Sequence, residues 1–378
     1  MNKRKFIAAG AALGLVATLF ATGHAANAEP VSPGLSVVGS DTLQDVVNAL
    51  ANGTQITGSA IRTTGGSTNI GAFDATGSVL IQTKAAGPRF GRPNGSTDGI
   101  IALSRSIDGG NYTARTPGSP TVAIPNQVDI ARSSSGPASG AGAGSADPMG
   151  PLRFIQFGRD ALAYAYTGGT AAWANIDHAT LTDIFDGGAP VSIDGVQVTA
   201  VIPQAGSGTR QDWLNKLIGA NDYPNGGTVP AGILVGQEHD TTHLADGSNF
   251  PTNAIIPISA AQWVAQNTGA GIDRRGPGAQ IGSPIAGVAA VTGSGSSAVP
   301  NQAYYSNTTW GRDTYIVVEN ARVTLGDAKY NAGLANAVSN AASKLGNHGA
   351  LQNQAGAVKR KFGFLAPSST TPIRAKLR

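Results

Sequence analysis

Hydroxyl residues and glycine gather at two turns that could bind a negatively charged group. Ser40-Asp41-Thr42 and Ser207-Gly208-Thr209 each follow an apolar run and precede a segment with helical spacing. A helix N-terminus offers unpaired N–H groups and a partial positive charge, and Ser and Thr hydroxyls add donors. Gly208 also allows a close backbone approach. Each turn alone is explained as an ordinary N-cap, but the two together indicate an oxyanion site.

Arginines and further hydroxyls lie near these turns in the sequence. Arg210 follows Ser207-Gly208-Thr209 and could bind an oxyanion bidentately, or it could be a solvated side chain of the first helical turn. Ser96 lies in a third donor-rich turn, residues 92–99, for which a plain surface turn is the alternative. A fourth segment combines an arginine with hydroxyls after an apolar run: Arg132, Ser133 and Ser134.

The elements around these turns alternate between strand-like and helix-like patterns. Residues 35–38 predict a buried strand, and residues 43–51 predict a helix because their apolar residues recur at helical spacing. We expect further strands at 128–131, 154–166 (as two runs), 196–203, 255–258, 285–291 and 315–318, and further helices at 211–218 and 328–345. This alternation predicts an α/β fold. The Gly/Ala/Ser-rich residues 133–148 predict a surface loop.

The N-terminus has the pattern of a cleaved signal peptide. A basic start at Lys3, Arg4 and Lys5 precedes an apolar run that is too short to span a membrane, and Ala26-Asn27-Ala28 offers small residues for cleavage. We therefore expect residues 1–28 to be removed and the mature chain to be secreted or periplasmic, without a membrane span.

Composition excludes several classes of protein. The chain has no cysteine, which excludes disulfides and a lipid-anchored cysteine, so a sizeable core must stabilise it. Only 13% of the residues are charged, and removing the three positive residues of the leader from the formal charge of +4 leaves about +1. These sparse, interspersed charges predict no nucleic-acid partner.

The sequence gives little support for a metal site or a catalytic site. His239 and His243 stand four apart, a metal-ligand spacing on a helix, but their segment lacks helical periodicity. We therefore expect no metal and no cofactor. The chain has no Gly-x-Ser-x-Gly elbow and no Gly-Lys pair of a P-loop, and we expect no catalytic residues.

In these motifs the chain resembles the phosphate-binding components of ABC transporters, within the type II periplasmic binding protein family. The matching features follow the family's order over most of the mature chain. They are Gly-Ser-x-Thr at 39–42, Gly-Ser-x-x-Gly-Ile at 95–100, residues 128–133, the crossing segment 159–163, Leu-Thr-x-Ile-Phe-x-Gly at 181–187 (with Asp186 before the Gly) and Ser-Gly-Thr at 207–209.

The resemblance implies two α/β lobes, joined by a hinge, that bury the ligand in a cleft. The first lobe would comprise residues 29–166 and 312–378, and the second residues 167–311. The implied contacts are Ser40, Thr42, Ser133 and Ser207 to Thr209. The implied function is a monomeric, non-enzymatic solute-binding protein that captures an oxyanion, above all inorganic phosphate, for an ABC transporter permease. A secreted phosphate-ester hydrolase and a ligand-free envelope interaction protein are the alternatives.

Two departures from the family pattern concern the charges of the site. The family's arginine before Ser-Gly-Thr is missing at residues 202–205, so Arg210 or Arg132 would have to supply the positive charge. The family also places an aspartate after the serine that matches Ser133, where it accepts the proton of hydrogen phosphate; this chain has Ser134. Asp41 could take that role from the first turn.

Overall fold

The first lobe is built on parallel strands with near-continuous apolar runs. The structure, a computed structural model, describes residues 31–65 and 68–378, so the predicted signal peptide lies outside the described residues. Strand β1 (Leu35–Gly39) is buried throughout and pairs in parallel with β2 (Ile70–Ala72) and β7 (Ile130–Ser133). A strand that is buried on both faces has apolar residues in nearly every position, and not in every second position. The loops after β1 and β7 therefore leave the sheet at the same edge.

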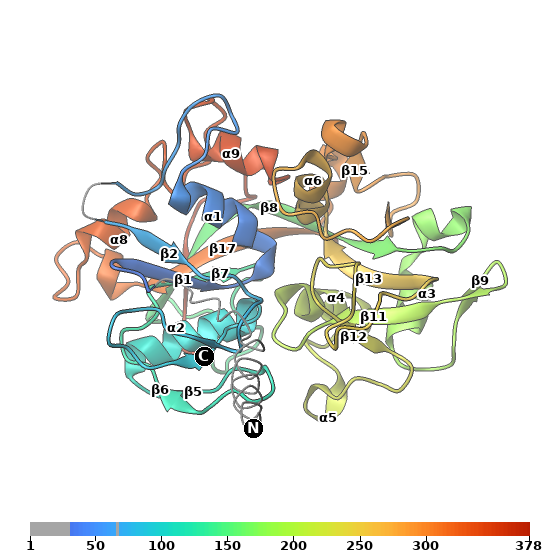
Figure 1. Cartoon of the computed structure of the whole chain (residues 1–378), viewed down its shortest axis with the longest axis horizontal. Helices are drawn as coiled ribbons and strands as arrows, with labels where there is room; N and C mark the ends of the chain where they lie inside the picture. Colours follow the sequence, from blue (N-terminus) through green and yellow to red (C-terminus); the bar gives the residue numbers. More distant parts are fainter. Residues whose placement is uncertain (1–30, 66–67) are drawn as a thin grey trace, which may run out of the picture.

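Two long strands connect this part of the sheet to the second lobe. Strand β17 (Gly311–Glu319) pairs antiparallel with β7 and with β8 (Leu152–Tyr166). Residues 152–161 of β8, apart from Phe157 at a bulge, pair with β17, and the last five residues pair with β13 (Ala254–Ser259). Figure 1 shows β8 and β17 running between the two halves of the molecule. One strand thus belongs to both lobes.

The second lobe repeats the parallel arrangement. Strand β11 (Thr199–Pro203) lies in parallel between β13 and β12 (Leu234–Gly236). The order of the main sheet is β12-β11-β13-β8-β17-β7-β1-β2, with β14 (Gln280–Gly282) and β18 (Ile373–Ala375) also pairing with β8. The loops after β11 and β12 leave the sheet at the edge that faces the first lobe's loops. This is the mixed α/β, two-lobed architecture that the sequence predicted.

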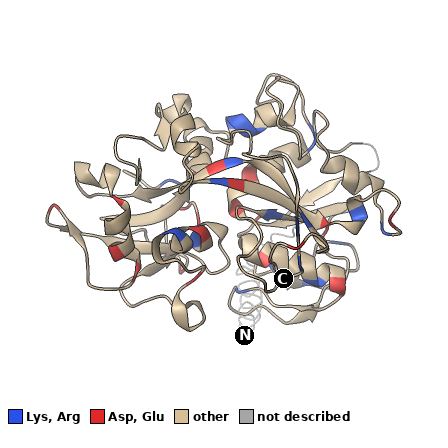
Figure 2. Ribbon diagram, turned by 180° about the vertical axis from the view of Figure 1, so that it is seen from behind, with Lys and Arg blue, Asp and Glu red and all other residues tan. Residues whose placement is uncertain are grey.

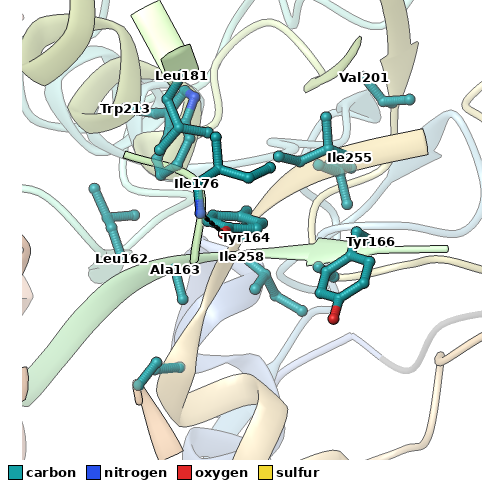
Figure 3. Close-up of a cluster of buried hydrophobic side chains, with 14 of the residues drawn as sticks. Leu162, Ala163, Tyr164, Tyr166, Ile176, Leu181, Val201, Trp213, Ile255 and Ile258 are labelled. Carbon is teal, nitrogen blue, oxygen red and sulfur yellow. Dashed lines mark hydrogen bonds between the residues drawn. The ribbon is translucent and has the colours of Figure 1, made fainter. Parts of the chain in front are cut away.

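Helices cover the sheet and close separate apolar cores. In the first lobe, α1 (Gln44–Asn52) and α9 (Ala355–Lys361) pack in one cluster, and α2 (Ser96–Asp108) packs in another on the other face. In the second lobe, Trp213 of α4 (Gly208–Ile218) lies in a third cluster with Tyr164 and with α3 (His178–Phe185). Figure 3 shows Trp213, Leu181, Ile176 and Tyr164 grouped on one side of the sheet. The exact lobe boundaries, 166/167 and 311/312, stay a prediction.

Several local predictions are confirmed and three are wrong. The strands at β1 and β11 and the helices α1 and α4 form where the residue spacing predicted them. The predicted interruption of residues 154–166 is absent, because β8 runs through Gly158 without a break. The predicted helix 328–345 contains only α8 (Ala332–Ala337), and only the end of 285–291 forms a strand, β15 (Val291–Thr292). Among residues 31–65 and 68–378, no helix is long and apolar enough to span a bilayer.

Asp160, on β8, joins the crossing strands to the second lobe. Its fully buried carboxylate accepts hydrogen bonds from the Ser259 hydroxyl (2.8 Å), the Ala261 N–H (3.0 Å) and Arg312 Nε (3.0 Å). Figure 2 shows that charged residues are sparse on the ribbon, yet several lie on the two strands between the lobes. A buried charge of this kind persists only with a partner.

We predict that Asp160→Ala lowers the free energy of unfolding by about 3–5 kcal/mol, because it removes one of the two carboxylates that pair with the buried Arg312 guanidinium and leaves Arg312 Nε without an acceptor. Urea unfolding followed by circular dichroism measures the change. Asp273→Ala is the control, since it removes one half of an exposed ion pair with Arg275 and should cost less than about 1 kcal/mol. Equal losses in the two variants would contradict the structural role of Asp160.

Candidate anion-binding site

The first predicted turn follows β1 and carries a buried hydroxyl. Gly39 has φ of 103°, and a Cβ there would lie 2.7 Å from the Arg132 carbonyl oxygen, so both the conformation and the packing require glycine. The Ser40 N–H donates to that same carbonyl at 3.1 Å. The Ser40 side chain is fully buried, and its Oγ finds no hydrogen-bond partner among the described residues. It makes no N-cap bond to the short helix Asp41–Leu43 that leads into α1.

Ser96 and Ser134 meet although 38 residues separate them. Ser96 is the first residue of α2, and Ser134 follows β7. Their Oγ atoms are 3.0 Å apart, and the Ser134 N–H donates to Ser96 Oγ at 2.9 Å. Ser133 differs, because its hydroxyl donates to the Ser135 carbonyl at 2.6 Å within its own loop. Ser134, and not Ser133, therefore contacts the Ser96 hydroxyl.

The turn of the second lobe packs directly onto these serines. Ser207 caps α4 by accepting from the Arg210 N–H at 3.0 Å. A Cβ on Gly208 would lie 2.4 Å from Ser134 Oγ and 2.5 Å from Ser96 Oγ. The Thr97 N–H donates to the Gly206 carbonyl across the same contact at 3.0 Å. The turns at Ser96, Ser134 and Ser207, distant in the sequence, thus converge between the lobes.

Arg312, which the sequence analysis missed, lies beside this convergence. Its Nη2 donates to Thr209 Oγ1 at 2.8 Å, while Nε donates to Asp160 and Nη1 to Asp212. Burial would lower the pKa of Arg312, but the charges of Asp160 and Asp212 raise it above its ordinary value. The guanidinium therefore stays charged at every physiological pH.

A sequence signal for Arg312 did exist. Gly-Arg-Asp occurs on both crossing strands, at Gly158 to Asp160 and at Gly311 to Asp313. In the antiparallel register, Arg312 pairs with Asp160 and Asp313 with Arg159. Repeated charges of opposite sign on two apolar strands indicate a buried ion-pair ladder.

The two arginines that the sequence proposed serve other contacts. Arg210 turns away from Thr209 and binds Asp222 through Nε (2.9 Å) and Nη2 (2.5 Å), with its guanidinium over the Tyr223 ring. Arg132 is fully buried behind the first turn, where its Nη2 donates to the Gly39 carbonyl at 3.0 Å. Burial lowers the pKa of Arg132 to about 10. Arg132 therefore supports the Ser40 turn from behind.

Thr42 and Asp41 face a second group of residues from the other lobe. Thr42 Oγ1 donates to Glu238 Oε1 at 2.9 Å and lies 2.9 Å from His239 Nε2. Asp41 Oδ2 accepts from Gln237 Nε2 at 2.9 Å. A cavity of about 340 Å³ opens between the lobes here, lined by Asp41, Glu238 and His239 among others. Sequence reasoning missed Glu238, which lies two residues after β12.

Opposite shifts mark the two carboxyl groups of this second group. Burial, and then the negative charge of Glu238, raise the pKa of Asp41 well above its ordinary value. Burial would also raise the pKa of Glu238, but the positive charge of His239 and the neighbouring polar groups of His239, Asp41 and Ser207 hold it below its ordinary value. The same surroundings thus raise the pKa of one carboxyl group and lower the pKa of its neighbour.

The chain is similar in structure to solved phosphate-binding proteins. No protein-family model and no curated protein sequence matches it. A phosphate-binding protein from Stenotrophomonas maltophilia is 12% identical, covering 90% of this chain and 92% of its own, with a TM-score of 0.48. An ABC-type phosphate transport receptor from Vibrio cholerae is 16% identical, covering 88% and 100%, with a TM-score of 0.46. A human phosphate-binding apolipoprotein is also 16% identical, covering 88% and 91%, with a TM-score of 0.46. This likeness concerns the fold, so we assign residue roles from contacts in this chain alone.

We predict that Gly208→Ala prevents the lobes from closing as they do here, because its methyl group would overlap the Ser96 and Ser134 hydroxyls of the first lobe. Small-angle X-ray scattering should then give a larger radius of gyration than for the wild type. Folding of α4 should not suffer, since alanine is a better helix former than glycine.

Gly142→Ala is the matched control for Gly208→Ala, because nothing lies within 4 Å of a Cβ at that position. It should leave the scattering curve unchanged. A Gly208→Ala curve that superposes on the wild-type curve would show that Gly208 does not govern closure.

Proposed function

We propose that this chain is a secreted solute-binding protein whose lobes close on an oxyanion, with inorganic phosphate as the preferred ligand. The observation that carries the proposal is the convergence of Ser96, Ser134 and Gly208 beside the Arg312 guanidinium. The second lobe contributes a helix N-terminus at Gly208, and the first contributes another at Ser96. Two such N-termini and a permanent positive charge favour a small anion.

The donor groups are of the kinds that bind a tetrahedral oxyanion. Ser40 Oγ, buried without a partner among the described residues, supplies a free hydroxyl from the first lobe. The Ser96, Ser134 and Thr209 hydroxyls are neutral and their bonds can be exchanged. Hydrogen bonds from buried neutral donors, with one arginine, stabilise an anion without a surrounding of lysines.

Entry of the ligand requires that the lobes separate first. Ser96 and Ser134 bond each other, and Gly208 lies against both, so an anion must replace these contacts. Hinge bending of β8 and β17 would open the site, and reclosure would exclude water and exchange hydroxyl–hydroxyl bonds for hydroxyl–anion bonds. The gain comes from replacing neutral hydrogen bonds with charge-assisted ones.

We assign the positive charge of the site to Arg312 and not to Arg210 or Arg132. Arg312 is the arginine that donates to a hydroxyl of the Ser-Gly-Thr turn, whereas Arg210 binds Asp222 and Arg132 Nη2 binds the Gly39 and Phe73 carbonyls behind the first turn. Asp41 does not fit the proton-accepting role, because its carboxyl contacts Gln237 and faces Glu238.

The same geometry favours binding over catalysis. Hydroxyls and backbone amides dominate the convergence, and Asp160 and Asp212 hold its arginine in place by ion pairs. We propose a monomeric, non-enzymatic protein that delivers its anion to an ABC transporter permease. The predicted leader agrees with secretion or a periplasmic location.

We predict that Ser40→Ala weakens phosphate binding by about 1–3 kcal/mol, or about 5- to 150-fold, in isothermal titration calorimetry, because a donor to the anion is lost. Stability should stay within about 0.5 kcal/mol, since the hydroxyl has no partner to lose. Ser133→Ala is the comparison, and it should change affinity less because its hydroxyl bonds within its own loop.

The same titrations test the proposed function as a whole. Wild-type protein should bind phosphate and should not release the chromophore of an aryl phosphate. No heat from phosphate, sulfate or molybdate would overturn the proposal, and turnover of the aryl phosphate would favour the hydrolase.

We predict that phosphate binds more tightly than sulfate by only a small factor, because the Ser134 hydroxyl can donate to either anion or accept the proton of hydrogen phosphate. Ser134→Asp should raise the ratio of phosphate to sulfate affinity, since a carboxylate repels the unprotonated sulfate. Competition calorimetry measures the ratio. An unchanged ratio in Ser134→Asp would place Ser134 away from the anion.

A further inference from the structure

Three potential metal ligands from both lobes meet beside the proposed anion site. Asp41 lies just after β1 in the first lobe, and Glu238 and His239 follow β12 in the second. One ligand atom of each lies within 4.8 Å of the others. Ligands that bind one Zn²⁺ at 2.0–2.2 Å stand roughly 3–4 Å apart, so small side-chain movements suffice to surround an ion.

Two oxygens of this group have no partner. Asp41 Oδ1 and Glu238 Oε2 are buried, and neither takes part in a hydrogen bond among the described residues. Glu238 is only 2% exposed. Buried carboxylate oxygens are normally satisfied, because an uncompensated buried charge is costly. The unsatisfied oxygens leave a place for a cation between the two carboxyl groups.

The arrangement also contains a group that can orient the ligands. Thr42 Oγ1 is 2.9 Å from both Glu238 Oε1 and His239 Nε2, so its hydroxyl holds the carboxylate and the imidazole together. Such outer contacts usually fix the orientation of metal ligands. On the far side of the ring, the Ser259 N–H approaches His239 Nδ1 at a long 3.4 Å. An ion on Nε2 would move the ring proton to Nδ1 and end that weak contact.

We propose that Asp41, Glu238 and His239 bind a divalent cation of the Zn²⁺ or Mn²⁺ type, which joins the two lobes. One imidazole and two carboxylates suit these ions better than Ca²⁺ or Mg²⁺, which prefer oxygen ligands alone. The cavity of about 340 Å³ that Asp41, Glu238 and His239 help to line gives the ion a path from solvent and room for water ligands. This site differs from the His239–His243 pair that the sequence suggested, since the His243 side chain is 50% exposed.

The ion would have two physical effects. It would neutralise two carboxyl groups whose burial is otherwise unfavourable, and it would bridge residues that separate when the lobes open. The proposal concerns this cluster alone and does not depend on the identity of the anion.

Titration of tag-free, metal-stripped protein in phosphate-free buffer tests the site. We expect one equivalent of Zn²⁺ or Mn²⁺ to bind in calorimetry and to raise the melting temperature, and Mg²⁺ or Ca²⁺ to bind more weakly. Glu238→Gln and Asp41→Asn should each reduce affinity for Zn²⁺ at least ~10-fold, as the loss of a ligand costs no less than the loss of an outer contact.

Two further variants separate ligand loss from misfolding. His239 has φ of 62°, a conformation that asparagine tolerates, so His239→Asn should fold and lose Zn²⁺ affinity. His243→Asn, on the same loop, should bind Zn²⁺ as the wild type does. Absence of Zn²⁺ and Mn²⁺ binding by the wild type, or full affinity in Glu238→Gln and Asp41→Asn, would overturn the proposal and favour a proton shared by the two carboxyls. Phosphate binding by the wild type would stand in either case.

Discussion

The buried ion pair between Arg312 and Asp160 is the constraint on which the site depends. It joins neighbouring positions of β17 and β8, the two strands that run between the lobes. Asp160 also holds Ser259 and Ala261 at the start of the second lobe's helix α6 (Ala260–Thr268), while Arg312 reaches Thr209. A buried pair is rarely a net source of stability, but it fixes geometry because neither partner can be left alone. The ion pair thereby connects the two crossing strands to the turn at Ser207 to Thr209.

The site is formed by the ends of parallel strands. Loops after β1, β7, β11 and β12 all leave the sheet toward the cleft between the lobes, as is general for open α/β sheets. Two of them continue directly into helices, so each brings N–H groups as well as hydroxyls. The close contact of Gly208 with Ser96 and Ser134 shows how little space side chains may occupy there. Glycine at 208 is therefore a requirement of closure and not of helix formation.

Residue spacing predicted the helices and turns of the proposed site, but not the distant residues that contact them. The pattern at Leu43, Val46, Val47 and Leu50 predicted α1 because the driving contact is periodic and local. The role of Arg312 depends on an antiparallel register between strands about 150 residues apart, which no local pattern contains. Glu238 was missed for the same reason, since its partner Thr42 lies in the other lobe. The long Ala-rich helix failed because Asn331 caps the start of α8 and the Ser339 hydroxyl bonds the Asn336 carbonyl just after it, so these residues favour caps and turns over a helix interior.

In the proposed site the positive charge comes from Arg312 on a crossing strand and not from an arginine of the second lobe. This placement changes how anion binding depends on closure of the lobes. An arginine next to Ser-Gly-Thr would travel with the second lobe, whereas Arg312 lies on the crossing strand β17, which pairs with β7 and β8. The open form then already presents a charge at the base of the cleft. Asp160 and Asp212 reduce the net field of that charge, so a bound anion gains less from Coulomb attraction and more from the hydroxyls that closure brings together. Affinity in such a site follows the completeness of closure, because the donors of the two lobes come together only when the Ser207 turn meets the turns at Ser96 and Ser134.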